Sequence, residues 1–306
     1  MKRLLVTGSN GLLGQKITDI LLQGQFPGFE YIASSRGSDR FGTSSRYRYL
    51  DLDITHHEQV AKAIETYRPD IIINTAAMPN VDACEREPEK SYEVNVVAVA
   101  HLIAVCERKN IHLIHLSTDF VFDGEEGPYE EEDIPNPVNT YGKHKLAAEE
   151  LIQKATCPWA IVRTILVYGV LRDMSRSNIV LWAKGALENG QSIRVVNDQW
   201  RMPTLAEDLA KACLTIAERK ATGMYHISGK DMFSICEIVE AVAAYYRLDA
   251  SFICKEKSEV LKQDARRPKR TGFILDKAYE RLDYVPHSFG EGLKLINEQL
   301  ARLQSS

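Results

Sequence analysis

The feature that most constrains the fold is a glycine-rich turn directly after the first apolar segment. Residues 3–7 predict a strand, Gly8, Gly11 and Gly14 follow it, and residues 12–23 predict an amphipathic helix. In such a strand–turn–helix unit the glycines let the backbone approach a diphosphate. The phosphate charge then meets free amides at the positive end of the helix dipole. The turn therefore predicts a dinucleotide-binding α/β unit at the start of the chain.

The first half continues as alternating strands and helices. The pattern predicts strands at 31–34, 47–52, 70–74, 112–117 and 159–167, and helices at 57–67, 91–109 and 139–154. Strands such as 70–74, with Ile71, Ile72 and Ile73 in succession, are nearly continuously apolar, which is typical of a parallel sheet covered on both faces. Residues 1–170 are thus predicted to form a doubly wound α/β domain whose ligands bind beyond the carboxyl ends of the strands.

The alternation weakens after residue 170. Strands are predicted at 193–200 and 224–228, and helices at 203–217, 234–246 and 290–304. We expect residues 203–222 to return to the first domain. Residues 171–202 and 223–306 are expected to form a smaller α/β substrate-binding domain.

Composition narrows the function classes. The chain has 38 Lys and Arg against 42 Asp and Glu, a formal charge of −4, so nucleic acids and membrane surfaces are not expected partners. The polar residues 7–11 end the first apolar run too early for a signal peptide. The six cysteines form no CxxC pair, and no cluster of side chains has metal-ligand spacing. We expect a soluble, cytoplasmic protein with reduced thiols and no metal.

The end of the second predicted strand indicates which nicotinamide cofactor is preferred. Ser35 and Arg36 stand where NAD-dependent enzymes place a carboxylate for the ribose hydroxyls, and a guanidinium there suits a 2′-phosphate. NADPH is the predicted cofactor, with NADH possible; the alternative is that Arg36 is a solvated surface charge. Asp53, followed by Ile54, can reach the adenine amino group. The small side chains of Ala76 and Ala77 leave room for the cofactor.

Three further residues form a candidate proton-transfer set. Tyr141 and Lys145 are four residues apart, on one helix face, and Thr118 ends the strand at 112–117. A neighbouring ammonium is expected to lower the pKa of the tyrosine phenol. Thr118 and Tyr141 can polarise a substrate carbonyl while a nicotinamide delivers hydride. His115, within an apolar strand, is expected to be a core histidine with satisfied hydrogen bonds rather than a catalyst.

Three segments carry a family resemblance: Val6-Thr7-Gly8-Ser9-Asn10-Gly11-Leu12-Leu13-Gly14, Ser117-Thr118-Asp119-Phe120-Val121-Phe122-Asp123-Gly124 and Tyr141-Gly142-Lys143-His144-Lys145-Leu146. With them the chain resembles the extended short-chain dehydrogenases/reductases, in particular the dTDP-4-dehydrorhamnose reductase-like proteins. The resemblance implies a Rossmann domain, catalytic Thr118, Tyr141 and Lys145, and cofactor contacts that add Asn10, Leu12, Leu13 and Asn95 to those above. It also implies the substrate contacts Val81, Asp82, Thr118, Asn178, Trp200, Arg201 and Arg267.

The implied activity is NADPH-dependent reduction of the 4-keto group of a nucleotide-linked 6-deoxysugar, as in dTDP-rhamnose synthesis. Two departures affect the sugar pocket. No aromatic residue precedes Val167-Tyr168-Gly169, and Trp200-Arg201 replaces a usual glycine. Both departures are also similar to the regulatory β subunit of methionine adenosyltransferase, so a cofactor-binding regulatory subunit is an alternative. Nucleotide-sugar epimerisation is another. The expected partner is a nucleotide sugar, and a homodimer is possible.

Overall fold

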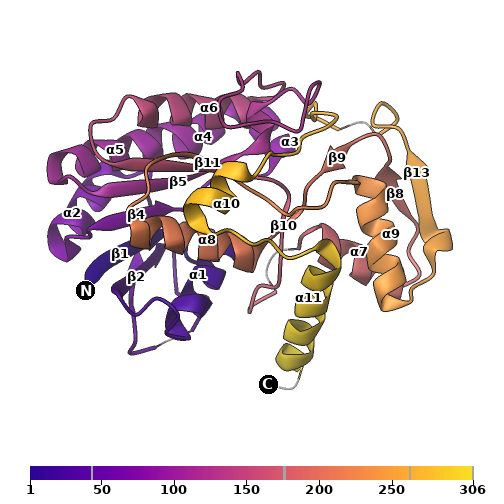
Figure 1. Cartoon of the computed structure of the whole chain (residues 1–306), viewed down its shortest axis with the longest axis horizontal. Coiled ribbons are helices and arrows are strands. Elements are labelled where there is room, and N and C mark those ends of the chain that lie inside the picture. Colours follow the sequence, from indigo (N-terminus) through magenta and orange to yellow (C-terminus); the bar gives the residue numbers. More distant parts are fainter. Residues whose placement is uncertain (43, 175–176, 262, 305–306) are drawn as a thin grey trace.

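The computed structural model describes residues 1–42, 44–174, 177–261 and 263–304. Its centre is a sheet of seven parallel strands in the order β11-β6-β5-β4-β1-β2-β3 (Figure 1). The strands are β1 (Lys2–Thr7), β2 (Phe29–Ser35), β3 (Arg48–Asp51), β4 (Ile71–Asn74), β5 (His112–Thr118), β6 (Trp159–Thr164) and β11 (Gly223–Ile227). Because all of them are parallel, their carboxyl ends meet along one edge.

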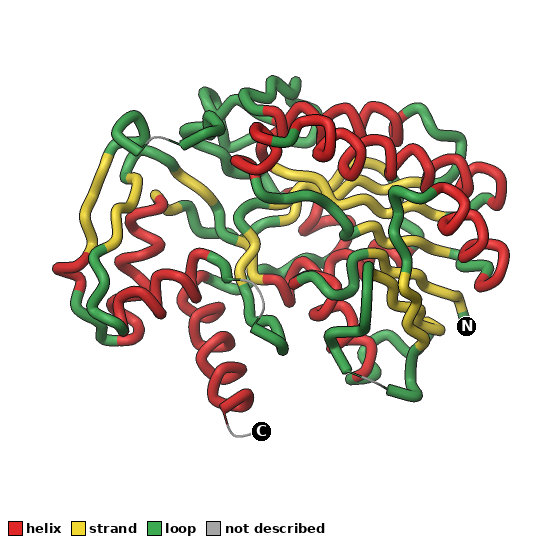
Figure 2. The backbone as a smooth tube through the Cα atoms, turned by 180° about the vertical axis from the view of Figure 1, so that it is seen from behind, coloured by secondary structure: helices red, strands yellow, loops and turns green. Residues whose placement is uncertain are grey.

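Helices cover both faces of this sheet. Ile72 of β4 packs into the core under α2 (His57–Tyr67), α5 (Ala98–Lys109) and α6 (Thr140–Gln153). Ile71 and Ile73 point the other way, into the core under α1 (Leu12–Leu22), α8 (Ala206–Arg219) and α10 (Asp276–Leu282). Figure 2 shows the sheet between these two layers. The predicted doubly wound α/β domain is confirmed, and burial of both faces explains why β4 is apolar at every position but its last.

A smaller second unit has its own apolar core, to which Val180, Val195 and Ile238 contribute. Its helices are α7 (Ile179–Glu188), α9 (Ile235–Tyr246) and α11 (Phe289–Gln304), and its parallel strand pair is β8 (Ile193–Val196) with β13 (Ile253–Glu256). Helix α11 is the last helix of the described chain, at the bottom of the view in Figure 1, and its Gln299 bonds Lys16 of α1 and Glu207 of α8. The short elements are α3 (Val81–Arg86), α4 (Pro88–Tyr92), the π-helix η1 (Glu93–Val97), the 3₁₀-helices η2 (Asp119–Val121) and η3 (Ala250–Phe252), and the strand pairs β7 (Val167–Tyr168) with β10 (Thr204–Leu205) and β9 (Trp200–Arg201) with β12 (Phe233–Ser234).

Several predicted boundaries are corrected. Residues 223–227 were expected in the second unit but form β11, the edge strand of the main sheet, and α10 packs on the same core. The strand predicted at 159–167 ends at Thr164, because Leu166 takes a left-handed backbone conformation (φ 38°). The helix predicted at 91–109 is three consecutive helical segments, α4, η1 and α5.

No helix among the described residues is both long enough and apolar enough to cross a membrane.

Candidate active site

The glycine turn lies between β1 and α1 at the carboxyl edge of the sheet. Gly8 has φ +74°, and a Cβ there would lie 2.7 Å from the backbone nitrogen of Ala76. A Cβ on Gly14 would lie 2.5 Å from the Cα of Ser9, so this glycine lets α1 press against the turn. Gly11 caps α1 without a side-chain hydrogen bond, which leaves the first helix amides facing the turn. This frame suits the diphosphate of a dinucleotide.

A cavity opens beside the turn and collects most of the residues predicted to bind the cofactor. Its lining includes the predicted residues Gly8, Asn10, Gly11, Ser35, Arg36, Asp53, Ile54, Ala76 and Ala77. It also includes Arg40, Leu52, Thr55, Thr75 and Val94, which sequence reasoning missed. The site thus spans the ends of β1, β2 and β4 and the chain that follows β3.

Four predicted cofactor contacts have a different or an additional role. The amide of Asn10 donates to the carbonyl oxygen of Ser38 and accepts from the backbone nitrogen of Arg40, so it orders the loop that carries Arg36. Leu13 is buried in the core. Leu12 lies against Gly169, where a Cβ would come 3.2 Å from its Cδ1.

Asn95 is the fourth of these residues. It is buried, and its side-chain amide bonds both backbone polar groups of Met78. It therefore holds the loop after β4 instead of lining the cavity, which makes it a positioning residue.

Arg36 and Asp53 form the charged wall of the cavity. The Arg36 Nη1 lies 3.9 Å from the Asp53 Oδ2, and the Arg36 side chain is 73% exposed. Burial opposes ionisation of Asp53, but hydrogen bonds from the amide and hydroxyl of Thr55, together with Arg36, outweigh it and hold the carboxyl pKa below its ordinary value. Asp53 is therefore a charged acceptor at neutral pH, and Arg36 is an exposed guanidinium beside it.

The predicted proton-transfer residues lie two strands from the glycine turn, at the same edge. Thr118 is the last residue of β5, and Tyr141 lies in the first turn of α6. A Cβ on Gly142 would overlap the carbonyl oxygen of Phe120, so only glycine allows α6 to approach η2 this closely. The Thr118 hydroxyl lies close enough to the Tyr141 phenol to act on its pKa, and it donates to the Asp119 Oδ1 over 3.1 Å. The structure therefore brings together the two groups that were predicted to share a carbonyl oxygen.

Burial is the main influence on the Tyr141 phenol. It raises the pKa above the ordinary value, the nearby Asp119 carboxyl raises it further, and the Thr118 hydroxyl opposes both. The prediction that Lys145 lowers this pKa is wrong, because the pKa is raised by burial and by Asp119. Tyr141 is thus a neutral phenol at physiological pH, a form able to donate a proton.

Lys145 lies one turn further along α6 and is 2% exposed. Its Nζ donates to the carbonyl oxygen of Leu116 over 2.6 Å and lies 2.8 Å from the Nε2 of His115. Burial lowers the pKa of the amine to about 8, although the Glu149 carboxylate acts in the opposite direction. His115 is buried with both ring nitrogens bonded, as expected of a core histidine.

Four of the side chains expected to contact substrate make internal contacts instead: Asn178, Arg201, Asp82 and Arg267. Asn178 caps α7 by accepting from the amides of Val180 and Leu181, and it donates to the carbonyl oxygen of Gly169. The buried Arg201 donates to the carbonyl oxygens of Trp200 and Pro268. It also faces the Asp119 carboxylate at 3.6 Å.

Asp82 and Arg267, both expected to bind substrate, bind each other through two hydrogen bonds of 3.1 and 2.6 Å. The pair connects α3 to the loop that precedes α10. Val81 begins α3 after its cap Asn80, and the Trp200 side chain is 36% exposed. Of the expected substrate residues, only Thr118 lies in the proton-transfer group.

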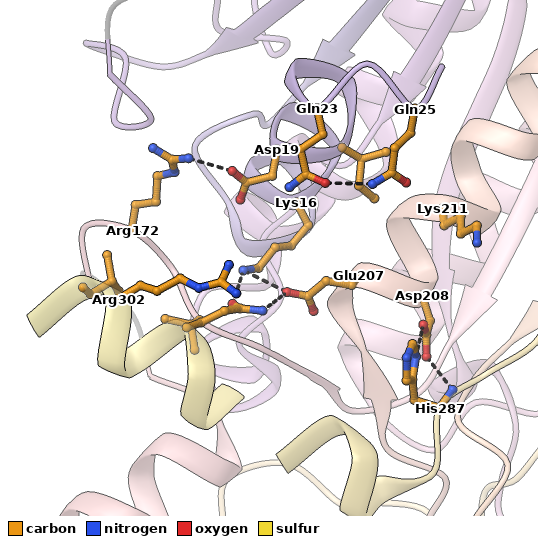
Figure 3. Close-up of a pocket in the computed structure, with 14 residues that line it drawn as sticks. Lys16, Asp19, Gln23, Gln25, Arg172, Glu207, Asp208, Lys211, His287 and Arg302 are labelled. Atoms are coloured by element: carbon orange, nitrogen blue, oxygen red, sulfur yellow. Dashed lines mark hydrogen bonds and ion pairs between the residues drawn. The ribbon is translucent and has the colours of Figure 1, made fainter. Parts of the chain in front are cut away.

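A larger cavity, of about 470 Å³, lies elsewhere, between α1, α8 and α11 (Figure 3). Polar side chains pair across it: Lys16 with Glu207, Arg172 with Asp19, and His287 with Asp208. Lys16 also donates to Gln299 of α11. The contact of Lys16 with Gln299 joins α11 to the main domain, and neither the glycine turn nor the proton-transfer residues line this cavity.

Among the residues with described coordinates, no group of three or more His, Cys, Asp or Glu side chains is placed to hold a metal ion.

The chain is similar to several known proteins over most of its length. A family model described as RmlD substrate binding domain matches residues 1–302. The dTDP-4-dehydrorhamnose reductase of Aggregatibacter actinomycetemcomitans is 30% identical over 313 residues, covering 97% of this chain and 98% of that protein. Methionine adenosyltransferase 2 subunit beta of Danio rerio is 30% identical over 273 residues, covering 88% of this chain and 81% of that protein.

A solved structure of similar fold is dTDP-4-dehydrorhamnose reductase from Bacillus anthracis in complex with NADP. It has a TM-score of 0.84 at 26% identity and covers 97% of this chain and 99% of that chain. The span matched by the family model contains both units of the fold and every candidate site residue.

Proposed function

The chain belongs to the RmlD substrate binding domain family, and from this premise we propose that it is an NADPH-dependent reductase of the 4-keto group of a nucleotide-linked 6-deoxysugar, of the dTDP-4-dehydrorhamnose type. One observation carries the proposal. The Thr118 hydroxyl and the Tyr141 phenol meet at the edge of the sheet that also carries the glycine turn. The similarity to dTDP-4-dehydrorhamnose reductases supports a nucleotide-sugar oxidoreductase of this type.

The cavity beside the glycine turn fits a nicotinamide dinucleotide. Gly8 and Gly11 would face its diphosphate. Position 8 requires glycine, because a Cβ there would overlap the backbone just after β4. Asp53 would accept from the adenine amino group, and Arg36 would bind a 2′-phosphate. The bound structure of the Bacillus anthracis reductase contains NADP, which agrees with a preference for NADPH over NADH.

The chain's own residues supply the acid chemistry. When bound, the reduced nicotinamide supplies the hydride. Thr118 donates a hydrogen bond to the ketone oxygen, which draws charge away from the carbonyl carbon. Tyr141, kept neutral by burial, donates its proton to that oxygen as negative charge develops there. Lys145 lies one helical turn after Tyr141 on α6 and would hold the nicotinamide ribose.

A second candidate is a cofactor-binding regulatory subunit with little turnover. The observation that favours it is the internal use of Asn178, Arg201, Asp82 and Arg267, which a sugar nucleotide was expected to contact. The similarity to methionine adenosyltransferase 2 subunit beta points the same way. A regulatory subunit does not need an acid and a hydroxyl in contact, so we rank it second.

Turnover separates the two. Purified protein with NADPH and dTDP-4-dehydrorhamnose should oxidise the cofactor, and Tyr141→Phe should reduce kcat by about 10²–10⁴-fold. Tyr168→Phe is a matched control, because that buried tyrosine packs against Phe289 in the second unit. Equal inactivity of wild type and Tyr141→Phe, with both still binding NADPH, would favour the regulatory candidate.

A further inference from the structure

Two buried cysteines lie together at the edge of the sheet opposite the glycine turn. Cys106 lies in the last turn of α5, and Cys157 lies in the segment between α6 and β6. Both side chains belong to the same apolar core, where Cys106 is 0% and Cys157 is 4% exposed. Because the two residues are far apart in the sequence, only the fold makes them neighbours.

A hydrogen-bonded pair of residues beside the cysteines holds the segment against the helix. Glu107 directly follows Cys106, and its Oε1 accepts from the backbone nitrogen and the hydroxyl of Thr156 over 2.9 and 3.2 Å. Thr156 directly precedes Cys157. The residue after one cysteine thus binds the residue before the other.

Backbone hydrogen bonds hold both cysteines on the side of β5 as well. The amide of Ile111 donates to the carbonyl oxygen of Cys106 over 2.9 Å, where the chain passes from α5 into β5. The amide of Leu113 on β5 donates to the carbonyl oxygen of Pro158, also over 2.9 Å, and Pro158 directly follows Cys157. Both cysteines are therefore held at the amino end of β5, with their side chains in one core.

The two thiols also act on each other electrostatically. The neighbouring Cys106 thiol lowers the pKa of Cys157, and the neighbouring Cys157 thiol, together with burial, raises the pKa of Cys106. Cys157 is therefore the thiol that ionises first, and a thiolate is the form that reacts with oxidants. The exposed residues Thr156 and Pro158 flank it, which gives a small oxidant the shorter path to this sulfur.

We propose that Cys106 and Cys157 form a redox-active pair that a peroxide converts into a disulfide. The Cys157 sulfur attacks one peroxide oxygen and becomes a sulfenic acid, while the O–O bond breaks and the other oxygen leaves as water or an alcohol. The Cys106 sulfur then attacks the Cys157 sulfur, and the hydroxyl of the sulfenic acid leaves as water with the proton of the Cys106 thiol. Overall the two thiols lose two hydrogens and two electrons, and the peroxide is reduced.

The disulfide would close the segment that carries the proton-transfer residues. Thr118, Tyr141 and Lys145 all lie between positions 106 and 157, and a cross-link there restricts the conformations of this segment in the unfolded chain. The bond itself would form at the amino ends of β5 and β6, whereas Thr118 lies at the carboxyl end of β5. We therefore expect oxidation to stabilise the fold and to leave the geometry around Thr118 unchanged.

The test is peptide mapping of the folded, full-length protein before and after treatment with hydrogen peroxide. The wild type should lose two of its six free thiols and about 2 Da of mass. Digestion without reductant should then release one cross-linked peptide pair that contains Cys106 and Cys157. Dithiothreitol should reverse these changes, and the oxidised protein should melt several degrees above the reduced protein.

Three variants make the test selective. Cys106→Ser should stop at the sulfenic acid of Cys157, which dimedone traps as a stable adduct. Cys157→Ser should form neither the adduct nor the cross-link. Cys213→Ser is the matched control, because it removes a fully buried thiol of α8 from the other core of the main domain, and it should cross-link as the wild type does.

Two results with the wild type alone would overturn the proposal, whether or not a variant folds. One is that all six thiols stay reduced in folded protein treated with peroxide. The other is that Cys157 is oxidised without becoming joined to Cys106.

Discussion

Replacing Lys145 with methionine should remove a pH dependence of stability that the buried amine creates. The lysine pKa is lowered from 10.5 to about 8 in the folded protein, which corresponds to about 3 kcal/mol. Between those values the unfolded chain binds a proton that the folded protein does not bind. The free energy of unfolding of the wild type therefore rises with pH across this window. The destabilisation that the buried ammonium causes is fully present below about pH 8 and disappears above about pH 10.5.

The assay is urea unfolding of wild type and Lys145→Met at several pH values across this window. Methionine leaves the Leu116 carbonyl oxygen without its donor, an offset of about 1–3 kcal/mol that does not depend on pH. The free energy of unfolding of the wild type minus that of the variant should therefore increase by about 3 kcal/mol between about pH 8 and pH 10.5, whether the difference itself is positive or negative.

Lys143→Met is the matched control, because Lys143 lies on the exposed face of the same helix. Its curve should run parallel to that of the wild type. If the Lys145→Met curve also ran parallel to it, the amine would not be buried as the structure places it, and the reasoning about Lys145 would be wrong.

Three further predictions concern the cofactor wall, the turn and the cap. Arg36→Ala should raise the KM for NADPH about tenfold or more and leave that for NADH within about twofold; equal effects on both would assign Arg36 to solvent. Gly14→Ala should lower the melting temperature and weaken dinucleotide binding, because the new Cβ meets backbone. The control is Gly185→Ala in α7, where a new Cβ meets open space, and it should be neutral or stabilising by up to about 1 kcal/mol. A larger loss of stability in Gly185→Ala than in Gly14→Ala would contradict the packing described for the turn. Asn178→Ala should cost about 1 kcal/mol in urea unfolding while Asn178→Asp keeps the cap; a raised KM for the sugar nucleotide with unchanged stability would return Asn178 to the substrate site.

The central sheet could be predicted because its signals are local. Ile71, Ile72 and Ile73 are apolar in succession because each face of β4 is covered, and the glycine turn marks where β1 ends. Short elements gave no comparable signal. Helix α3 has only six residues, and the pairing of β7 with β10 joins segments some 40 residues apart that are too short to show a period.

The candidate site was predictable where backbone geometry dictates the residue. Gly8 and Gly14 are required by close approaches of the main chain, and the four-residue spacing of Tyr141 and Lys145 follows from the helix. The structure adds that Gly142 brings Tyr141 to Thr118, which the spacing alone could not indicate.

The substrate contacts were not predictable in the same way, because their partners lie far along the chain. Asp82 and Arg267 bind each other across 185 positions, and a sequence alone does not show that each satisfies the other. Arg201 likewise finds Asp119 through folding of the second unit onto the first. The burial of His115 was predictable from its apolar strand, but its partners Asn74 and Lys145 were not, because they come from two other elements.

The most direct test of the proposed reductase follows a deuterium label. NADPH carrying deuterium at the transferred position is mixed with the protein and dTDP-4-dehydrorhamnose, and the sugar product is analysed by mass spectrometry and NMR. A hydride-transferring reductase with Tyr141 as its acid should form one labelled product at C4 for each NADPH oxidised, and Tyr141→Phe should form almost none. An epimerised product without net oxidation of NADPH would contradict the proposal, as would unlabelled sugar recovered with the cofactor intact.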